Sequence, residues 1–188
     1  MITPKVNGTK VVFGPCRLSY THVFAKYTPN GGDPADGKYQ TNVLIPKSEK
    51  ETIKALNAAI EAAKQAGVVS KWSGKVPKNL TMPLNDGDTA KDDELYEDHF
   101  YVNAKCNTRP GIVDRNKQPI VDEEEMYSGV WAIVSVTFFP YEVSGNKGVA
   151  CGLNNLMKWK DDEHLGGRVS AEADFGDVDT SSEDNEDL

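Results

Sequence analysis

The sequence contains no run of eighteen apolar residues, and its first five residues lack the apolar core of a signal peptide. These two absences predict a protein that stays in a cytoplasm and does not enter a membrane. Only three of the 188 residues are cysteine, and no Cys-x-x-Cys pair is present to bind zinc. We therefore expect Cys16, Cys106 and Cys151 to be reduced and buried among strand residues.

Signals of catalysis are equally scarce. His22, His99 and His164 have no neighbouring residues that suggest a nucleophile, a base or a metal site, so we expect them to be structural. The glycine pairs Gly31-Gly32 and Gly166-Gly167 lack the spacing and the following Lys-Ser/Thr of a nucleotide-binding loop. The sequence therefore predicts neither an enzyme nor a cofactor.

Charge is sorted along the chain. Residues 1–80 carry twelve Lys or Arg against five acids, whereas seven acids surround Lys91 between Asp86 and Asp98, and four more fill 122–125. We expect both acidic segments to be solvated loops. A metal-dependent nuclease would hold a divalent ion in the first of them. However, a calcium loop starting at Asp86 requires glycine where Lys91 stands, so we expect no bound metal.

The last seventeen residues form a separate acidic segment. They hold eight of the 29 acids and no Lys or Arg, so residues 1–171 balance at 21 acids and 21 bases. This predicts one domain, 1–171, followed by a disordered acidic tail, 172–188. Such a tail either only aids solubility, or occupies a cationic groove until a stronger polyanion displaces it and then reaches a partner protein. The second reading assigns partner contacts to Asp174, Phe175, Asp177, Asp179, Glu183, Asp184, Glu186, Asp187 and Leu188.

Periodicity predicts a mainly β protein with one substantial helix. The helix runs from Ser48 to about Gln65, with Ser48 and Glu51 as a capping box and Gly67 as the stop. Its apolar face carries Ile53, Leu56, Ile60 and Ala63. Alternating polar and apolar residues predict five strands, in Lys10–Phe24, Lys38–Ile45, Phe100–Asn107, Gly129–Tyr141 and Gly148–Lys158. Five strands and one helix indicate a small barrel.

Strand alternation also sorts the side chains between the core and the surface. In the fourth run, Val130, Ala132, Val134, Val136 and Phe138 are expected in the core. Two other runs expose aromatic, amide and cationic groups on their outer faces. The exposed residues are Lys38, Gln40 and Asn42 in the second run, and Tyr101, Asn103, Lys105 and Asn107 in the third.

These outer faces suit a single nucleic-acid strand, which needs cations for its phosphates and flat rings for its unpaired bases. We expect Lys38, Lys105, Arg109 and Arg115 to neutralise phosphates, Tyr101 and Trp72 to stack on bases, and Gln40 and Asn103 to donate or accept hydrogen bonds. The alternative is that Tyr101 and Trp72 only cover the ends of the barrel. Trp131 shares its face with Ile133 and Phe139, which fits equally well beneath the helix or against a second subunit.

The chain resembles a family of tailed-bacteriophage proteins, formerly a domain of unknown function and since associated with single-stranded-DNA binding on an OB-fold. The segments that carry the resemblance span nearly the whole chain. They are Arg17-Leu18-Ser19-Tyr20, Lys38-Tyr39, Leu44-Ile45-Pro46-Lys47, Pro83-Leu84, Asp86-Gly87-Asp88, Arg109-Pro110-Gly111, Val113-Asp114, Tyr127-Ser128-Gly129, 146–155 (NKGVACGLNN), Gly166-Gly167-Arg168, Ser170-Ala171 and Asp174-Phe175.

The resemblance implies a five-stranded OB-like barrel that coats single-stranded DNA during phage replication, repair or recombination, in the cytoplasm of an infected bacterial host. It also implies an acidic tail comparable to those of other single-strand binders, which would dock replication or recombination proteins. The sequence is compatible with a homo-oligomer. The alternative function is a phage structural or partner-docking protein that does not bind nucleic acid.

Overall fold

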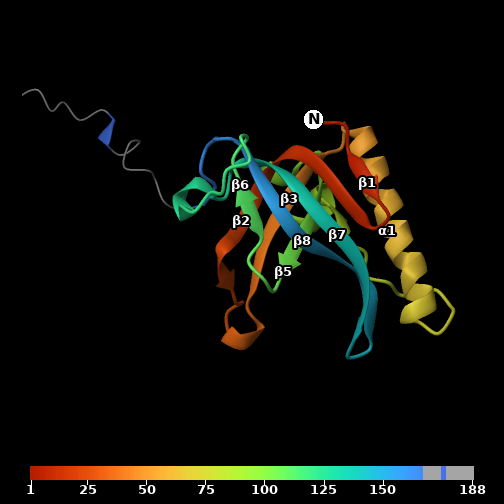
Figure 1. The fold of residues 1–188 in the computed structure, drawn as a ribbon. Coiled ribbons are helices and arrows are strands. Elements are labelled where there is room, and N and C mark those ends of the chain that lie inside the picture. The colour runs from red at the N-terminus through yellow and green to blue at the C-terminus, as the bar shows by residue number, and fades with distance from the viewer. Residues whose placement is uncertain (167–174, 177–188) are drawn as a thin grey trace, which may run out of the picture.

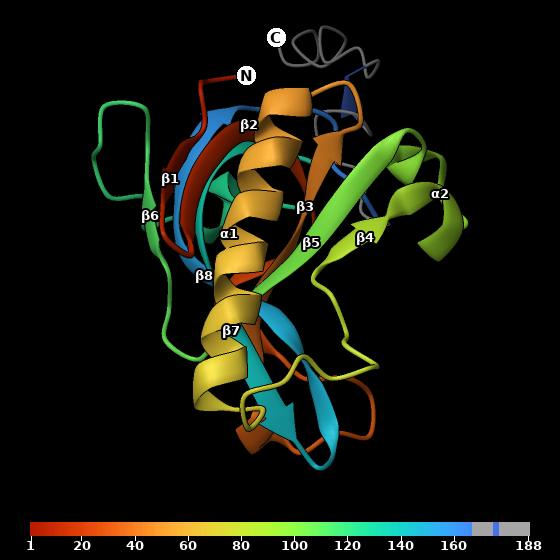
Figure 2. The same ribbon diagram turned by 90° about the vertical axis from the view of Figure 1, so that its right-hand side faces the viewer.

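The fold is a closed barrel of five long strands with one long helix along its side (Figures 1 and 2). The computed structural model describes residues 1–166, 175 and 176. The strands are β1 (Lys5–Asn7), β2 (Lys10–Tyr27), β3 (Lys38–Pro46), β4 (Leu84–Asp86), β5 (His99–Cys106), β6 (Gly111–Val113), β7 (Trp131–Val143) and β8 (Asn146–Lys160). The helices are α1 (Lys50–Ser70) and the short α2 (Gly87–Ala90), with single 3-10 turns η1 (Pro34–Asp36), η2 (Glu94–Tyr96) and η3 (Glu123–Glu125).

The barrel closes in the order β2, β3, β5, β8, β7 and back to β2. Every neighbouring pair is antiparallel except β5 and β8, whose parallel contact joins Ala104 to Cys151 and Lys105 to Gly152. This arrangement confirms the predicted five-stranded OB-like barrel, and each predicted run corresponds to one long strand. The short strands β1, β4 and β6 were not predicted; they pair with β2, β5 and β8, respectively.

The core follows the predicted alternation. In and just before β7, Val130, Ala132, Val134, Val136 and Phe138 are at most 1% exposed. Cys16 and Cys151 are buried in the same core, and burial raises the pKa of both thiols, so they stay protonated. Cys106 is only half-buried, because β5 ends there at the edge of the barrel. The expectation of three buried cysteines is therefore correct for two of them.

Helix α1 packs against β1, β2, β7 and β8 through its apolar face. Leu56, Ile60 and Ala63 are buried as predicted, and Ile53 is partly buried. The predicted capping box is wrong, because the N-cap residue is Glu49 and its side chain makes no capping hydrogen bond. The predicted stop at Gly67 is also wrong, since the helix continues to Ser70.

Gly67 has a packing role instead of a terminating one. A Cβ atom at this position would lie 2.7 Å from ring atoms of Trp72 and 2.7 Å from the Cβ of Pro140. Glycine therefore lets the last turns of α1 closely approach both the end of β7 and the Trp72 ring. Gly67 thus has a structural role, but this role is close packing and not the end of the helix.

Among the described helices, none combines the length and apolar character needed to cross a bilayer. The predicted boundary between 1–171 and the acidic tail lies outside the described residues. Of the tail residues expected to contact a partner, the structure describes only Phe175, which is exposed; Asp174, Asp177, Asp179, Glu183, Asp184, Glu186, Asp187 and Leu188 lie outside the described residues.

Candidate nucleic-acid interface

Strands β3 and β5 present one continuous polar outer face. Their register places Gln40 opposite Lys105 and Asn42 opposite Asn103. Beyond this row, the Lys38 ammonium donates a 2.7 Å hydrogen bond to Oδ1 of Asn107. Because directly opposed residues project to the same side of a sheet, four predicted residues, Lys38, Gln40, Asn103 and Lys105, share this face. We call the outer side of β3 and β5, with the part of β2 that continues it, the β2–β3–β5 face.

Strand β2 adds aromatic rings to this face. His22 lies opposite Gln40 and Tyr27 opposite Lys38, and the two rings stack with centroids 4.6 Å apart. Burial lowers the pKa of His22 from its ordinary value, so the imidazole is neutral at pH 7. Neither ring was predicted as part of the site. His22 lies in the predicted 10–24 run and Tyr27 lies beyond its end, and the register of β2 shifts between Ser19 and His22 and again before Tyr27.

Four cations of β2, β3 and β5 and of the segment after β5 have no acidic partner within the described residues. No carboxylate lies within 4.0 Å of the charged groups of Lys26, Lys38, Lys105 or Arg109 there, whereas the ion pairs of that part of the chain lie elsewhere on the surface. Lys26 instead lies over the ring of Tyr39, which alternates to the opposite side of β3 from Lys38 and Gln40, and the Arg109 guanidinium lies 4.4 Å from the ring centroid of Phe24. Of these four cations, the strand register places Lys38 and Lys105 on the β2–β3–β5 face.

Two loops border the exit of β5. The β2–β3 connection (28–37) and the tight turn between β7 and β8 (144–145) project from the same end of the barrel in both views (Figures 1 and 2). In an OB-fold, these positions correspond to the loops that flank the oligonucleotide-binding face. The β2–β3–β5 face therefore has the location and the borders of an OB-type binding site.

Tyr101 is on this face, but its ring is mostly covered. It is 9% exposed, and Tyr96 of η2 packs against it edge-on with ring centroids 5.0 Å apart. The Tyr96 hydroxyl in turn accepts a 2.8 Å hydrogen bond from the Asn42 side chain. The expectation that Tyr101 offers an open stacking surface is therefore corrected, because the acidic segment that precedes β5 folds over it.

The 86–98 segment is thus not simply the solvated loop that its charge predicted. Tyr96 is fully buried, and the Lys47 ammonium binds Asp86 at 2.7 Å and Asp88 at 2.5 Å. The hydrogen bond from Lys47 holds the pKa of the Asp88 carboxyl below its usual range. In the described part of the chain, no group of three or more His, Cys, Asp or Glu side chains converges as metal ligands would.

Trp72 does not belong to the site. It is 3% exposed, packs against Gly67 in the core, and its indole N–H points to the Tyr141 carbonyl at 3.4 Å. No face of this ring is open to a base, so the predicted stacking role is corrected. Lys71 and Lys75 flank Trp72 in the sequence and are exposed, but the Trp72 ring closes one end of the core beside α1.

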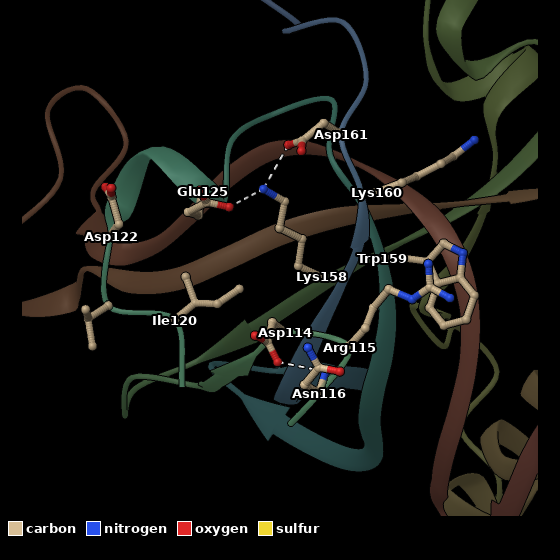
Figure 3. Close-up of a pocket in the computed structure, with 11 residues that line it drawn as sticks. Asp114, Arg115, Asn116, Ile120, Asp122, Glu125, Lys158, Trp159, Lys160 and Asp161 are labelled. Atoms are coloured by element: carbon tan, nitrogen blue, oxygen red, sulfur yellow. Dashed lines mark hydrogen bonds and ion pairs between the residues drawn. The ribbon is translucent and has the colours of Figure 1, made fainter. Parts of the chain in front are cut away.

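Arg115 lies apart from the other predicted cations. Its guanidinium stacks 4.1 Å from the Trp159 ring centroid, in a hollow that Lys158, Glu125 and Asp161 also line (Figure 3). The hairpin that carries Arg115 follows β6, which pairs with β8, and Figure 2 shows β6 at the opposite side of the molecule from β3 and β5. The structure therefore does not bring Arg115 together with Lys38 and Lys105.

Trp131 is half-buried on the outer side of β7. Its indole N–H donates a 2.7 Å hydrogen bond to Asp162, and the Lys160 ammonium lies 4.7 Å from its ring centroid. Trp131 is therefore not beneath α1, which was one of the two positions left open by the sequence. All three tryptophans lie off the β2–β3–β5 face.

This chain is similar in sequence and in fold to known phage proteins. A curated relative, "Putative protein p50" of Acyrthosiphon pisum secondary endosymbiont phage 1, is 28% identical over 186 residues, covering 93% of this chain and 97% of the relative. The single-stranded DNA-binding protein of bacteriophage Enc34, solved in complex with ssDNA, superposes with a TM-score of 0.73 at 25% identity, covering 84% of this chain and 90% of that one.

A more distant structure shows the fold alone. The single-stranded DNA-binding protein gp2.5 of bacteriophage T7 superposes with a TM-score of 0.61 at 15% identity, covering 86% of this chain and 97% of that one. The sequence profile of the family described as "Enterobacter phage Enc34, ssDNA-binding protein" matches residues 9–188, which is nearly the whole chain. The chain therefore belongs to the family of the Enterobacter phage Enc34 ssDNA-binding protein.

Proposed function

We propose that this protein coats single-stranded DNA without strong sequence preference and that the DNA lies along the β2–β3–β5 face. The observation that carries the proposal is the cross-strand row of Lys38, Gln40, Asn103 and Lys105 on one side of a closed barrel. Cations that follow the phosphates and rings that stack on bases are the requirements of such binding. The proposed role is non-catalytic.

Each group on the face has a proposed part. Lys38, Lys105 and Arg109 neutralise phosphates, because none of them has a carboxylate within 4.0 Å in the described residues. Gln40 and Asn103 form hydrogen bonds with the DNA backbone or base edges. The stacked His22–Tyr27 pair provides the ring surface that Trp72 and Tyr101 do not.

The acidic tail supports a regulatory addition to this proposal. A segment with eight acidic side chains and no Lys or Arg is itself a polyanion. It would compete with DNA for the cations of the face, and DNA binding would free it to recruit replication or recombination proteins. These events would take place in the cytoplasm of the infected bacterial host.

The direct test is fluorescence anisotropy of a labelled oligodeoxythymidine titrated with the full chain, at several salt concentrations and with unlabelled duplex as competitor. Tryptophan quenching is a poorer assay here, because all three tryptophans lie off the proposed path. We expect the affinity for the oligodeoxythymidine to fall steeply as salt rises, and we expect unlabelled duplex to be a poor competitor. Absence of binding at low salt, or binding insensitive to salt, would overturn the proposal.

A further inference from the structure

Tyr20 has an unusual backbone for a residue inside a strand. Its φ is 49°, in the left-handed region that bulky side chains rarely adopt. The other non-glycine residues with positive φ in the described chain all lie in turns; they are Ser73, Asp98, Lys117 and Ser144. Strained backbone within a regular element is a reason to look for a functional constraint on the side chain.

The strain holds the Tyr20 ring out of the barrel. The residue lies in the β2 irregularity between Ser19 and His22, and it is 53% exposed. Its two neighbours in the register belong to rows on the side of the β2–β3–β5 face, since Ser19 lies opposite Asn42, both buried beneath Tyr96, and His22 lies opposite Gln40. Tyr20 therefore stands between two cross-strand rows of the β2–β3–β5 face.

A lysine ammonium lies close to this ring. Lys91 Nζ is 5.2 Å from the ring centroid of Tyr20, 5.7 Å from that of Tyr96 and 5.8 Å from that of Tyr101. Lys91 is followed by Asp92 and Asp93, yet no carboxylate of the described residues lies within 4.0 Å of its ammonium. Three rings hold this charge at the border of the face, as aromatic side chains hold cations elsewhere.

We propose that Tyr20 and Lys91 form a binding site for one nucleotide, in which a base stacks on the Tyr20 ring and the adjacent phosphate pairs with the Lys91 ammonium. This inference rests on the proposed function, and it extends the DNA path from β3 and β5 across β2. It gives the face a second stacking surface beside the His22–Tyr27 pair, whereas Tyr101 is covered by Tyr96. It also explains why a tyrosine occupies a position where glycine or asparagine would fit the backbone better.

The test is a comparison of Tyr20→Asn with Tyr20→Phe in the full chain, measured by anisotropy with labelled oligodeoxythymidine and by thermal melting. Asparagine tolerates the left-handed backbone but cannot stack on a base in the same way. We expect Tyr20→Asn to melt no lower than the parent protein and to bind at least about fivefold more weakly, which is the lower end for losing one stacked base. Tyr20→Phe keeps the ring and should bind as the parent does.

The controls separate this inference from the proposed function. Ser73→Asn changes a residue of similar backbone, φ 53°, that lies outside the face, and it should leave binding unchanged. Lys91→Ala should reduce the salt dependence of binding by about one phosphate contact. If the parent binds and Tyr20→Asn binds equally well, or if Tyr20→Asn loses stability but not affinity, the inference is wrong while the function stands. If the parent does not bind, the proposed function fails.

Discussion

Removing Lys38 and Lys105 from the β2–β3–β5 face should reduce the salt dependence of DNA binding and leave the fold intact. Lys38 and Lys105 have no carboxylate within 4.0 Å in the described residues, so each is free to displace one counterion from a phosphate. For single strands the slope of log K against log salt is about −0.7 per phosphate contact, so the double variant Lys38→Ala/Lys105→Ala should lose about 1.4 from the slope. As salt rises from about 50 to about 200 mM, the ratio of the parent's affinity for DNA to that of the double variant should fall about sevenfold.

The assay is anisotropy of a labelled oligodeoxythymidine over that salt range, with melting temperature measured in parallel. Lys50→Ala/Lys54→Ala is the matched control, because both lysines are exposed on α1, which packs against the barrel away from β3 and β5. The control removes the same net charge and should leave the slope unchanged. The reasoning would be refuted if the control pair lowered the slope as much as the Lys38/Lys105 pair did, or if neither did.

Three further predictions follow from the described contacts. Gly67→Ala should destabilise the protein by about 1–3 kcal/mol in urea unfolding although alanine favours helices, because its Cβ would meet Trp72 and Pro140 at 2.7 Å; an unchanged midpoint would contradict this packing role. Acidification should tighten DNA binding and destabilise the free protein. The pKa of His22 is lowered in the folded protein, so the unfolded chain binds the imidazole proton more readily, and the stability that His22 contributes is present above its usual pKa, about 6.5, and is lost below it. His22→Gln should remove both effects in binding and melting titrations. Truncation after Ala171 should strengthen binding at low salt and have little effect at high salt; an equal affinity at low salt would argue against tail competition.

The barrel was predictable because its strands carry a clear period of two. The alternation in 129–141 placed the buried residues of β7 correctly, and the alternation in 38–45 and 100–107 placed Gln40, Asn103 and Lys105 on a common side. Such periodicity is a local property that tertiary contacts reinforce. The short strands β1, β4 and β6 have three residues each, too few to show any period.

The aromatic residues were harder to assign because their burial depends on distant segments. Trp72 is followed by Ser, Gly and Lys, which suggests exposure, but Gly67 and Pro140 enclose its ring. Tyr101 alternates outward as predicted, yet Tyr96 from a highly acidic segment covers it. The charge of that segment concealed one fully buried tyrosine. Tyr20 and Tyr27 are the converse case, rings on the outer face that the sequence did not indicate. Irregularities in β2 break the alternation that would have placed them outside.

The position of the DNA path is tested most directly by side-chain amide signals in NMR spectra of the protein during titration with a short oligodeoxythymidine. Gln40 and Asn103 lie on the β2–β3–β5 face, whereas Asn116 and Gln118 lie in the hairpin after β6. We expect the amide signals of Gln40 and Asn103 to shift with DNA concentration and those of Asn116 and Gln118 to stay in place. Shifts confined to Asn116 and Gln118 would contradict the proposed face.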